Sequence, residues 1–485
     1  MAVKTPVVIT IFGASGDLTR RKLLPALYNL CLDRHMPERF LILGVARRGD
    51  RDGFCRDIEA ALATHSRRGK PDPQQWGAFA AQVDYLCGGF DEEATYAALA
   101  ARIAEAEQDF GAPAARVFYL STPPDVFGLV AARLGASGLG RERGRDRIVV
   151  EKPFGRDLAG ATALDRALRE VFDESQIYRI DHYLGKETVQ NIMVLRFANS
   201  MFEPLWNRKY IDHVQITAAE EVGVGTRGAF YESTGVLRDI VQNHLLEVLA
   251  LVAMEPPNTG HADDVRGEKL QVLRALRVPW ADTVPGDVVL GQYQGYCGEP
   301  DVAADSRTPT FAALRVFIDN WRWQGVPFYL RAGKRMARRV TEVSVHLQDI
   351  PLSLFGRGDL CEHVEPNVLT LRIQPEEGIT LSFSAKLPGH DFTVTPVAMD
   401  MKYTEAFGGE PPEAYERLLL DAMRGDPTLF SRRDAVETSW NWIQPILDWA
   451  DSGAGGAPLP YAPGSWGPEA ADRLIHHDRR RWRNP

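Results

Sequence analysis

The segment Tyr178–Glu187, with the sequence YRIDHYLGKE, holds several side chains that can do chemistry. His182, Tyr183 and Lys186 supply three hydrogen-bond donors within five residues, and Gly185 and Lys186 are expected to open a helix. Donors and a positive charge at a helix start suit a phosphate dianion. The alternative interpretation is a loop-to-helix junction with a capping aspartate and a surface lysine, and this segment alone supports it equally well.

A second polar group interrupts an apolar helical pattern over residues 236–254. Its members are Asp239, Gln242, Asn243 and His244. Polar side chains in such a setting need a partner or a function. A single histidine on a helix is more often structural. This one is accompanied by an acid and two amides, and Asp181 of the earlier segment is a candidate acidic partner for it.

A glycine turn follows the first apolar run of the chain and leads at once into a helical pattern. Its residues are Gly13, Ala14, Ser15, Gly16, Asp17 and Leu18. A turn of this kind lets the backbone approach a pyrophosphate, at a helix end that favours anions. It departs from the usual G-x-G-x-x-G pattern, because Ser15 stands where the second glycine is expected. An ordinary turn is the alternative, but the strand–turn–helix context favours nucleotide binding.

The second apolar run, 40–45, is followed by Arg47 and Arg48, with no carboxylate before Asp50. Folds that bind NAD usually place Asp or Glu here for the ribose diol, whereas a 2′-phosphate needs cations. Arginine suits a phosphate because of its fixed fork of donors. Two solvated arginines in a loop are the alternative. Together with the glycine turn the pair favours NADP, and use of NAD stays open.

A lysine follows the apolar run at 148–150, in the sequence EKPFG. Ligands bind at the carboxyl ends of strands in open α/β sheets. Lys152, fixed by the proline after it, is therefore in a position to face both a cofactor and a substrate. A cis bond before Pro153 would fix this turn, which the sequence alone does not show.

The first part of the chain predicts the sheet that carries these turns. Near-continuous apolar runs are typical of strands buried on both faces. They occupy residues 7–12, 40–45, 117–120 and 148–150, and amphipathic stretches such as 18–30 lie between them. This alternation predicts an α/β domain with a Rossmann-type, doubly wound parallel sheet, which we expect to bind a dinucleotide and to cover residues 1–178.

The pattern changes after Tyr178, and we expect a larger substrate-binding and oligomerisation domain over residues 179–485. Helices are predicted at 186–199, 236–254, 413–424 and 435–450. From about residue 310 apolar and polar residues alternate strictly in several runs, which indicates a mainly antiparallel sheet with one covered face. The Gly/Pro-rich stretch 452–464 is predicted to be a loop. The fold class is therefore α/β followed by α+β.

Composition excludes other classes of protein. Lys+Arg 56 against Asp+Glu 65 gives a net charge of -9, which argues against nucleic-acid or anionic-membrane partners. No window approaches the roughly 20 apolar residues of a membrane span, and the N-terminus lacks a signal-peptide pattern. We expect a cytoplasmic protein with reduced thiols and no metal. The cysteines show no metal-ligand spacing, Cys361 beside His363 included; they are Cys31, Cys55, Cys87, Cys297 and Cys361.

Five stretches resemble the glucose-6-phosphate dehydrogenase family, in the order and spacing of that family. They are GASGDLTRRKLLPALYNL, EKPFG, RIDHYLGKETVQN, RGAFYESTGVLRDIVQNHLLEVLALVAMEPP and DNWRWQGVPFYLRAGKR. The resemblance runs from Val7 to beyond Trp440, and RIDHYLGKE is far more specific than the glycine turn. It implies oxidation of glucose 6-phosphate at C1 to the 6-phospho-lactone, with NADP as hydride acceptor, the first step of the oxidative pentose phosphate pathway.

The resemblance also implies roles for individual residues. His244 is the implied general base, and Asp181 is the acid that orients it. The implied sugar-phosphate contacts are His182, Tyr183 and Lys186 on the phosphate, Glu220 and Asp239 on hydroxyls, and Lys334 and Arg339. Lys22 and Lys152 are implied to lie between cofactor and sugar, with Arg47 on the 2′-phosphate.

Two alternatives stay open at this point. One is an NAD(P)-dependent dehydrogenase of an unphosphorylated sugar, which has no reason to carry His182, Tyr183 and Lys186 together. The other is a catalytically silent, nucleotide-sensing homologue, against which intact Asp181 and His244 argue. The resemblance further implies a homodimer or homotetramer, formed through the free face of the antiparallel sheet.

Overall fold

A computed structural model describes residues 3–485 except 281, 352–363, 391–393 and 410. The expectation about Cys361 and His363 therefore lies outside the described residues. Contacts within the chain define two compact units. The first comprises residues 1–186, 258–266 and 412–437, and the second comprises 187–257, 267–411 and 438–485. The domain limits predicted at 178 and 179 stay a prediction, and the structure adds two later segments to the first unit.

The first unit is built on a seven-stranded sheet in the order β15-β6-β5-β4-β1-β2-β3. All pairs are parallel except β15 with β6, which is antiparallel. The strands are β1 (Val7–Phe12), β2 (Phe40–Ala46), β3 (Val83–Cys87), β4 (Ala115–Leu120), β5 (Asp146–Val150), β6 (Ile177–Ile180) and β15 (Phe430–Ser431). The predicted doubly wound parallel sheet is confirmed, and β15 explains why late residues belong to this unit.

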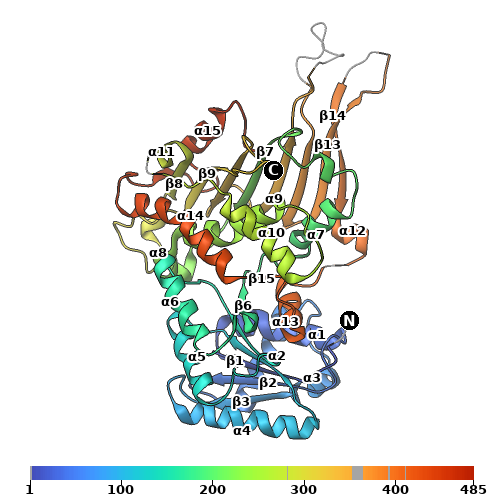
Figure 1. Ribbon diagram of the computed structural model, residues 1–485, viewed down its shortest axis with the longest axis vertical. Helices are drawn as coiled ribbons and strands as arrows, with labels where there is room; N and C mark the ends of the chain where they lie inside the picture. Colours follow the sequence, from blue (N-terminus) through green and yellow to red (C-terminus); the bar gives the residue numbers. More distant parts are fainter. Residues whose placement is uncertain (1–2, 281, 352–363, 391–393, 410) are drawn as a thin grey trace. The chain divides into compact units, whose positions relative to one another are not determined.

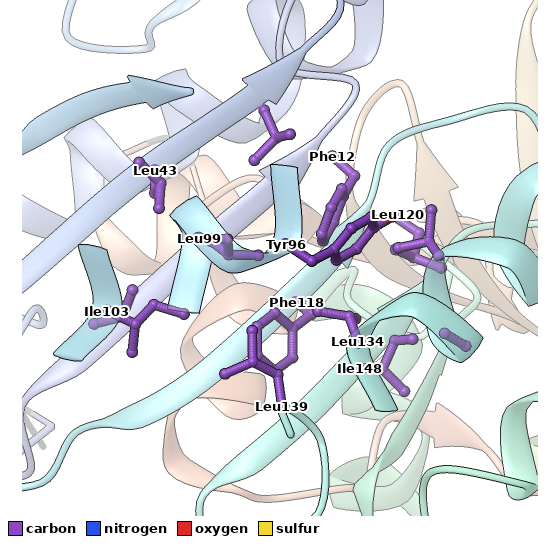
Figure 2. Close-up of a cluster of buried hydrophobic side chains, with 14 of the residues drawn as sticks. Phe12, Leu43, Tyr96, Leu99, Ile103, Phe118, Leu120, Leu134, Leu139 and Ile148 are labelled. Carbon is purple, nitrogen blue, oxygen red and sulfur yellow. The ribbon is translucent and has the colours of Figure 1, made fainter. Parts of the chain in front are cut away.

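Helices cover this sheet because its strands are apolar on both faces. One face packs on α4 and α5 through a cluster that includes Phe12, Tyr96, Phe118 and Leu134 (Figure 2). Helix α13 packs on α1 in the same unit. The helical segments are η1 (Thr19–Leu23), α1 (Leu24–Leu32), α2 (Arg51–His65), α3 (Pro73–Ala80), α4 (Glu93–Phe110), η2 (Pro124–Val126), α5 (Phe127–Ala136), α6 (Leu158–Arg169), η3 (Glu174–Gln176) and α13 (Ala414–Arg424).

The second unit contains a nine-stranded sheet in the order β14-β13-β12-β11-β7-β10-β9-β8-β16 (Figure 1). Most pairs are antiparallel, as predicted, but β7 pairs with β10 and β8 with β16 in parallel. The strands are β7 (Ile211–Ala219), β8 (Val288–Tyr293), β9 (Phe311–Phe317), β10 (Pro327–Gly333), β11 (Val340–Leu347), β12 (Val368–Gln374), β13 (Gly378–Lys386), β14 (Val394–Lys402) and β16 (Leu459–Tyr461).

Two expectations for this sheet need correction. The stretch predicted as a loop at 452–464 contains β16, because residues 459–461 add to the edge of β8. Strand β11 is buried from Val340 to Val345, on both faces rather than one. The second face is covered by the C-terminal segment, in which Arg483 pairs with Glu342 at 3.0 Å.

The helices predicted at 186–199, 236–254 and 435–450 are all present in the structure. The pattern at 236–254 forms a π-helical stretch, η6, that continues as α9. No helix of the described part of the chain is long and apolar enough to cross a membrane. The helical segments are α7 (Glu187–Phe197), η4 (Glu203–Leu205), η5 (Gly225–Arg227), α8 (Gly228–Val236), η6 (Leu237–Leu245), α9 (Leu246–Ala253), α10 (Ala262–Arg274), α11 (Val284–Asp287), η7 (Tyr296–Gly298), α12 (Tyr403–Phe407), α14 (Arg433–Asp451) and α15 (Glu469–His476). Helices α10 and α14 have residues in both units.

Candidate active site

The glycine turn after β1 has the geometry that a phosphate-binding turn needs. Gly13 has a φ of +83°, and a Cβ atom there would lie 2.1 Å from the Ser121 carbonyl oxygen, so only glycine fits. The N–H groups of Gly13 and Ala14 donate to the Val45 carbonyl at 2.9 and 3.2 Å. The turn is thereby held at the end of β2, and Ser15 at its tip is exposed.

An open cavity of about 490 Å³ lies over this turn, at the carboxyl ends of the parallel strands. The structure therefore brings the glycine turn and the two predicted arginines to one site, where open α/β sheets bind ligands. Ala14, Asp17 and Leu18 belong to the turn but are not among the residues around the cavity. The lining residues are Gly13, Ser15, Gly16, Ala46, Arg47, Arg48, Phe90, Ser121, Thr122 and Pro123.

The EKPFG turn after β5 is held by two tyrosines. Tyr119 and Tyr415 donate hydrogen bonds to the Glu151 carboxylate at 2.6 and 3.1 Å. Burial raises the pKa of Glu151, and it also raises the pKa of both tyrosines. The peptide bond between Lys152 and Pro153 is cis. The backbone that carries Lys152 is thus anchored on its inner side.

The residues just before α13 reach a second predicted lysine. Glu413 forms an ion pair with Lys22 at 2.8 Å, and both side chains are about two-fifths exposed. Two positions later, Tyr415 stacks on His182 with ring centroids 6.3 Å apart. A segment far from the glycine turn in sequence therefore contacts residues from three predicted motifs within the first unit.

The residues predicted to bind the phosphate lie together in the first unit, in a compact turn after β6. The N–H of Tyr183 donates to the Asp181 carboxylate at 2.9 Å, and the rings of His182 and Tyr183 lie 5.2 Å apart. The Lys186 ammonium lies 5.3 Å from the Tyr183 ring centroid. Gly185 is needed here, because a Cβ atom would lie 2.6 Å from the Ala414 carbonyl oxygen. The three predicted donors are therefore neighbours.

In the second unit, Asp239 and His244 lie on the π-helical stretch η6, and both are buried. Single turns of π-helix occur frequently at functional sites. Gln242 donates to Ser439 at 2.9 Å, and the Asn243 side chain accepts from the His244 N–H at 2.6 Å. Of the polar residues that the sequence singled out, Gln242 thus joins η6 to α14, and Asn243 bonds within its own helix.

A charged pair lies directly after the C-terminal ends of the neighbouring strands β7 and β10. These strands are parallel with Ala219 opposite Gly333, so the residues that follow them are side by side. Lys334 forms an ion pair with Glu220, and its ammonium lies 5.1 Å from the ring centroid of Tyr231. Burial, followed by the charge of nearby Asp239, raises the pKa of Tyr231. Three predicted sugar contacts therefore gather around one tyrosine.

Arg339 is exposed and directly precedes β11. Strand β11 pairs with β7 so that Val340 is opposite Ala219, which places Arg339 beside the same strand ends. A larger cavity of about 600 Å³ lies elsewhere in the second unit, beside Arg238, Arg307 and Trp449.

Sequence reasoning missed three tyrosines in these surroundings. Tyr119 is an ordinary buried strand residue in the sequence, and nothing in its neighbourhood marks its hydroxyl. Tyr231 lies in a stretch that carried the family resemblance, but no chemistry was assigned to it. Tyr415 could be found only from the fold, which brings it to Glu151. Asp181 and His244 belong to different units, so their pairing stays a prediction.

The doubly wound sheet, its glycine turn and the cavity at the strand ends together define a dinucleotide-binding protein of the Rossmann type. Comparison with known proteins specifies the family. The model of the glucose-6-phosphate dehydrogenase NAD binding domain matches residues 10–191, and the model of the C-terminal domain of the same enzyme matches residues 193–483. The chain belongs to the glucose-6-phosphate dehydrogenase family.

Individual relatives agree over their full length. Glucose-6-phosphate 1-dehydrogenase of Aggregatibacter actinomycetemcomitans is 46% identical, over 98% of this chain and 97% of that protein. The enzyme of Mycolicibacterium smegmatis is also 46% identical, with the same coverage. The crystal structure of glucose-6-phosphate 1-dehydrogenase from Mycobacterium avium matches this chain with a TM-score of 0.85 at 39% identity, and the match covers 99% of both chains. A glucose-6-phosphate dehydrogenase solved with its substrate glucose 6-phosphate has a TM-score of 0.91 at 34% identity over both whole chains.

Proposed function

We propose that this protein oxidises glucose 6-phosphate at C1 to 6-phospho-glucono-1,5-lactone, with NADP as the hydride acceptor. The observation that carries the proposal is the turn after β6, where His182, Tyr183 and Lys186 are neighbours. An imidazole, a phenol and an ammonium group in one turn form a set of donors suited to a phosphate dianion. The family names and full-length matches support the same substrate.

The cofactor is proposed to bind over the glycine turn. The absence of a side chain at Gly13 lets the turn fold tightly against Ser121, and a tight glycine turn between a strand and a helix is where a pyrophosphate binds. Arg47 and Arg48 line the same cavity and are exposed, as a contact with the 2′-phosphate of NADP requires. When bound, the nicotinamide supplies the hydride acceptor.

The residues of this chain then have three tasks. His244 takes the proton of the C1 hydroxyl while the hydride leaves C1, and neutral imidazole has a pKa suited to a general base. Asp181 is proposed to orient that ring and stabilise its protonated form. Glu220 and Lys334 hold sugar hydroxyls through the pair they form where β7 and β10 end. Phosphate contacts remote from C1 supply binding energy that positions the reacting end.

A steady-state assay of nicotinamide reduction tests the proposal. Glucose 6-phosphate and glucose are each offered with NADP and with NAD. We expect turnover only with the phosphorylated sugar at ordinary concentrations, and a higher kcat/KM with NADP. Equal kcat/KM for the two sugars would refute the phosphate site and favour a dehydrogenase of unphosphorylated sugars. Absence of reduction with every hexose phosphate would instead favour a nucleotide-sensing role.

The assembly and the compartment are also proposals. We propose a homodimer or homotetramer in which the face of the sheet near β13 and β14 meets a second copy. Exposed apolar residues on β14, Val397 and Met399, support this. We propose a cytoplasmic location, which the net charge of -9 and the scattered thiols support.

A further inference from the structure

The loop that carries the two proposed phosphate-binding arginines is tied down from the neighbouring strand. Arg47 and Arg48 follow β2, and β3 pairs in parallel with β2 so that Gly44 is opposite Tyr85 and Ala46 is opposite Cys87. The Tyr85 hydroxyl donates a hydrogen bond to the Arg48 carbonyl. Strand β3 therefore holds the backbone of the loop while leaving its side chains outside.

The ring of Tyr85 is itself fixed by packing. It lies 5.0 Å from the Phe54 ring of α2, between centroids. Phe54 can lie this close to the sheet because Gly44 has no side chain, since a Cβ atom there would be 2.8 Å from the Phe54 ring. On its other side Tyr85 meets Gly49, where φ is +111° and a Cβ atom would lie 3.1 Å from the hydroxyl oxygen. The hydroxyl is thus aimed at the loop by a rigid support.

The charges of the loop are left available for an anion. In the described part of the chain, neither Arg47 nor Arg48 forms a salt bridge with an acidic side chain. The nearest acid in sequence, Asp50, is occupied as the cap of α2, where its carboxylate accepts from the Gly53 N–H at 2.7 Å. Two exposed guanidinium groups on an anchored backbone form a pre-organised receptor.

We propose that Tyr85 is a positioning residue that sets the preference for NADP over NAD. The inference rests on the proposed role of Arg47 and Arg48 toward the 2′-phosphate. The hydrogen bond to the Arg48 carbonyl restricts the loop before the cofactor arrives, so less freedom is lost when the phosphate binds. Only a cofactor with a 2′-phosphate uses the arginines, so the benefit falls on NADP and not on NAD.

The test is the Tyr85→Phe variant, which keeps the ring and its packing and removes only the hydroxyl. One hydrogen bond of ordinary strength corresponds to roughly a fivefold change. We expect KM for NADP to rise about fivefold, with kcat, KM for NAD and KM for glucose 6-phosphate unchanged. Ser137→Ala is the matched control, because the Ser137 hydroxyl also donates to a backbone carbonyl, that of Leu134 at 2.9 Å, at the end of α5. The control should leave all four constants unchanged.

A double-mutant cycle separates positioning from general weakening. If Tyr85 acts through the arginines, Tyr85→Phe should change KM for NADP little in an Arg47→Ala, Arg48→Ala background. A second fivefold rise in that background would overturn the inference, as would an equal rise for NADP and NAD in the single variant. If the arginine variant itself keeps full NADP preference, the proposed cofactor contact fails. If that variant loses the preference while Tyr85→Phe keeps it, only the role of Tyr85 fails.

Discussion

In the first unit, the arginines and the turn serine proposed to bind the cofactor are exposed, whereas in the second unit the proposed base His244 and the nearby acid Asp239 are buried. Ser15, Arg47 and Arg48 lie at the surface around an open cavity. By contrast, His244 has a relative exposure of 1% and Asp239 of 8%. The cofactor end relies on backbone shape and on exposed cations that can pair with a charged ligand. At the sugar end, Glu220 and Lys334 already pair with each other.

This difference predicts how each region responds to substitution. Removing an exposed cation takes away one contact with the ligand and leaves the protein intact, so it should act mainly on KM. Removing one member of a buried or paired group leaves its partner unsatisfied, and it should act on turnover as well. The exception within the cofactor end is Gly13, whose role is steric.

The largest effect is expected for His244→Asn. Loss of a general base should lower kcat by about 10³-fold while binding of glucose 6-phosphate survives. Turnover is measured under saturating conditions, and sugar binding by calorimetry. His261→Asn is the control, because His261 is exposed and lies outside the proposed site. Retention of more than a few per cent of activity by the His244 variant would remove it from the role of base.

Gly13→Ala is expected to have the next largest effect. The added Cβ atom would meet the Ser121 carbonyl at 2.1 Å in a backbone with φ of +83°. Strain and displacement of the turn should weaken NADP binding by about 100-fold. Gly69→Ala is a matched control, because Gly69 has a similar φ of +71° but no atom within 4 Å of the new Cβ. Fluorescence titration of both variants with NADPH checks this, and similar losses in the two would show that backbone strain alone is responsible.

Glu220→Gln tests the arranged charges of the sugar end. It neutralises the partner of Lys334 where β7 and β10 end. We expect kcat/KM for glucose 6-phosphate to fall about 30-fold, since a charged hydrogen bond of roughly 2 kcal/mol is lost, with KM for NADP unchanged. Glu299→Gln is the control, because Glu299 pairs at 3.4 Å with Arg335, the residue that follows Lys334 in the sequence. A rise confined to KM for NADP would contradict the assignment of this pair to the sugar.

Arg47→Ala probes the exposed end. Loss of one exposed guanidinium should raise KM for NADP about tenfold and leave KM for NAD nearly unchanged, because only NADP carries a 2′-phosphate. Arg56→Ala, an exposed arginine on α2, is the control. Steady-state kinetics with both cofactors decide the matter. An equal rise for both would move the 2′-phosphate contact elsewhere.

Much of the fold was predictable because local patterns and tertiary structure agree. The apolar run at 7–12 forms β1 with the same limits, and the helix predicted at 413–424 is α13, Ala414–Arg424. Predictions differed from the structure where a distant segment decides the outcome. Residues 459–461 form β16 only because β8 offers an edge, and β11 is buried on both faces only because the C-terminal segment covers it.

The roles of the site residues stay predictions, but part of their grouping in the structure was predictable. Motifs contiguous in sequence, such as the residues from Asp181 to Lys186, form real neighbourhoods in the structure. The supporting tyrosines were not predictable, because Tyr85, Tyr231 and Tyr415 act through contacts that the fold creates. Tyr85, for example, contributes one hydrogen bond from its hydroxyl to the Arg48 carbonyl, and no pattern in the sequence around Tyr85 predicts that contact.

The smallest effect should come from the sheet that supports the sugar end. His346 on β11 stacks on His213 of β7, with ring centroids 4.1 Å apart. Burial, followed by the nearby charges of His213 and Arg483, lowers the pKa of His346 to about 3. Below pH 6.5, His346 therefore takes up a proton in the unfolded chain but stays neutral in the folded chain. The free energy of unfolding falls as the pH falls.

His346→Gln should reduce that fall by about 1.6 kcal/mol between pH 6.5 and pH 5. Denaturant unfolding at several pH values measures it, with His477→Gln as the control because His477 is exposed. The sign is fixed, since a lowered pKa in the folded state stabilises the protein only above the pKa of the unfolded chain. A pH dependence identical to that of the parent would mean that His346 accepts a proton in the folded sheet. Burial would then not exclude a proton from the strands behind the sugar end, which would weaken the contrast between a buried sugar end and an exposed cofactor end.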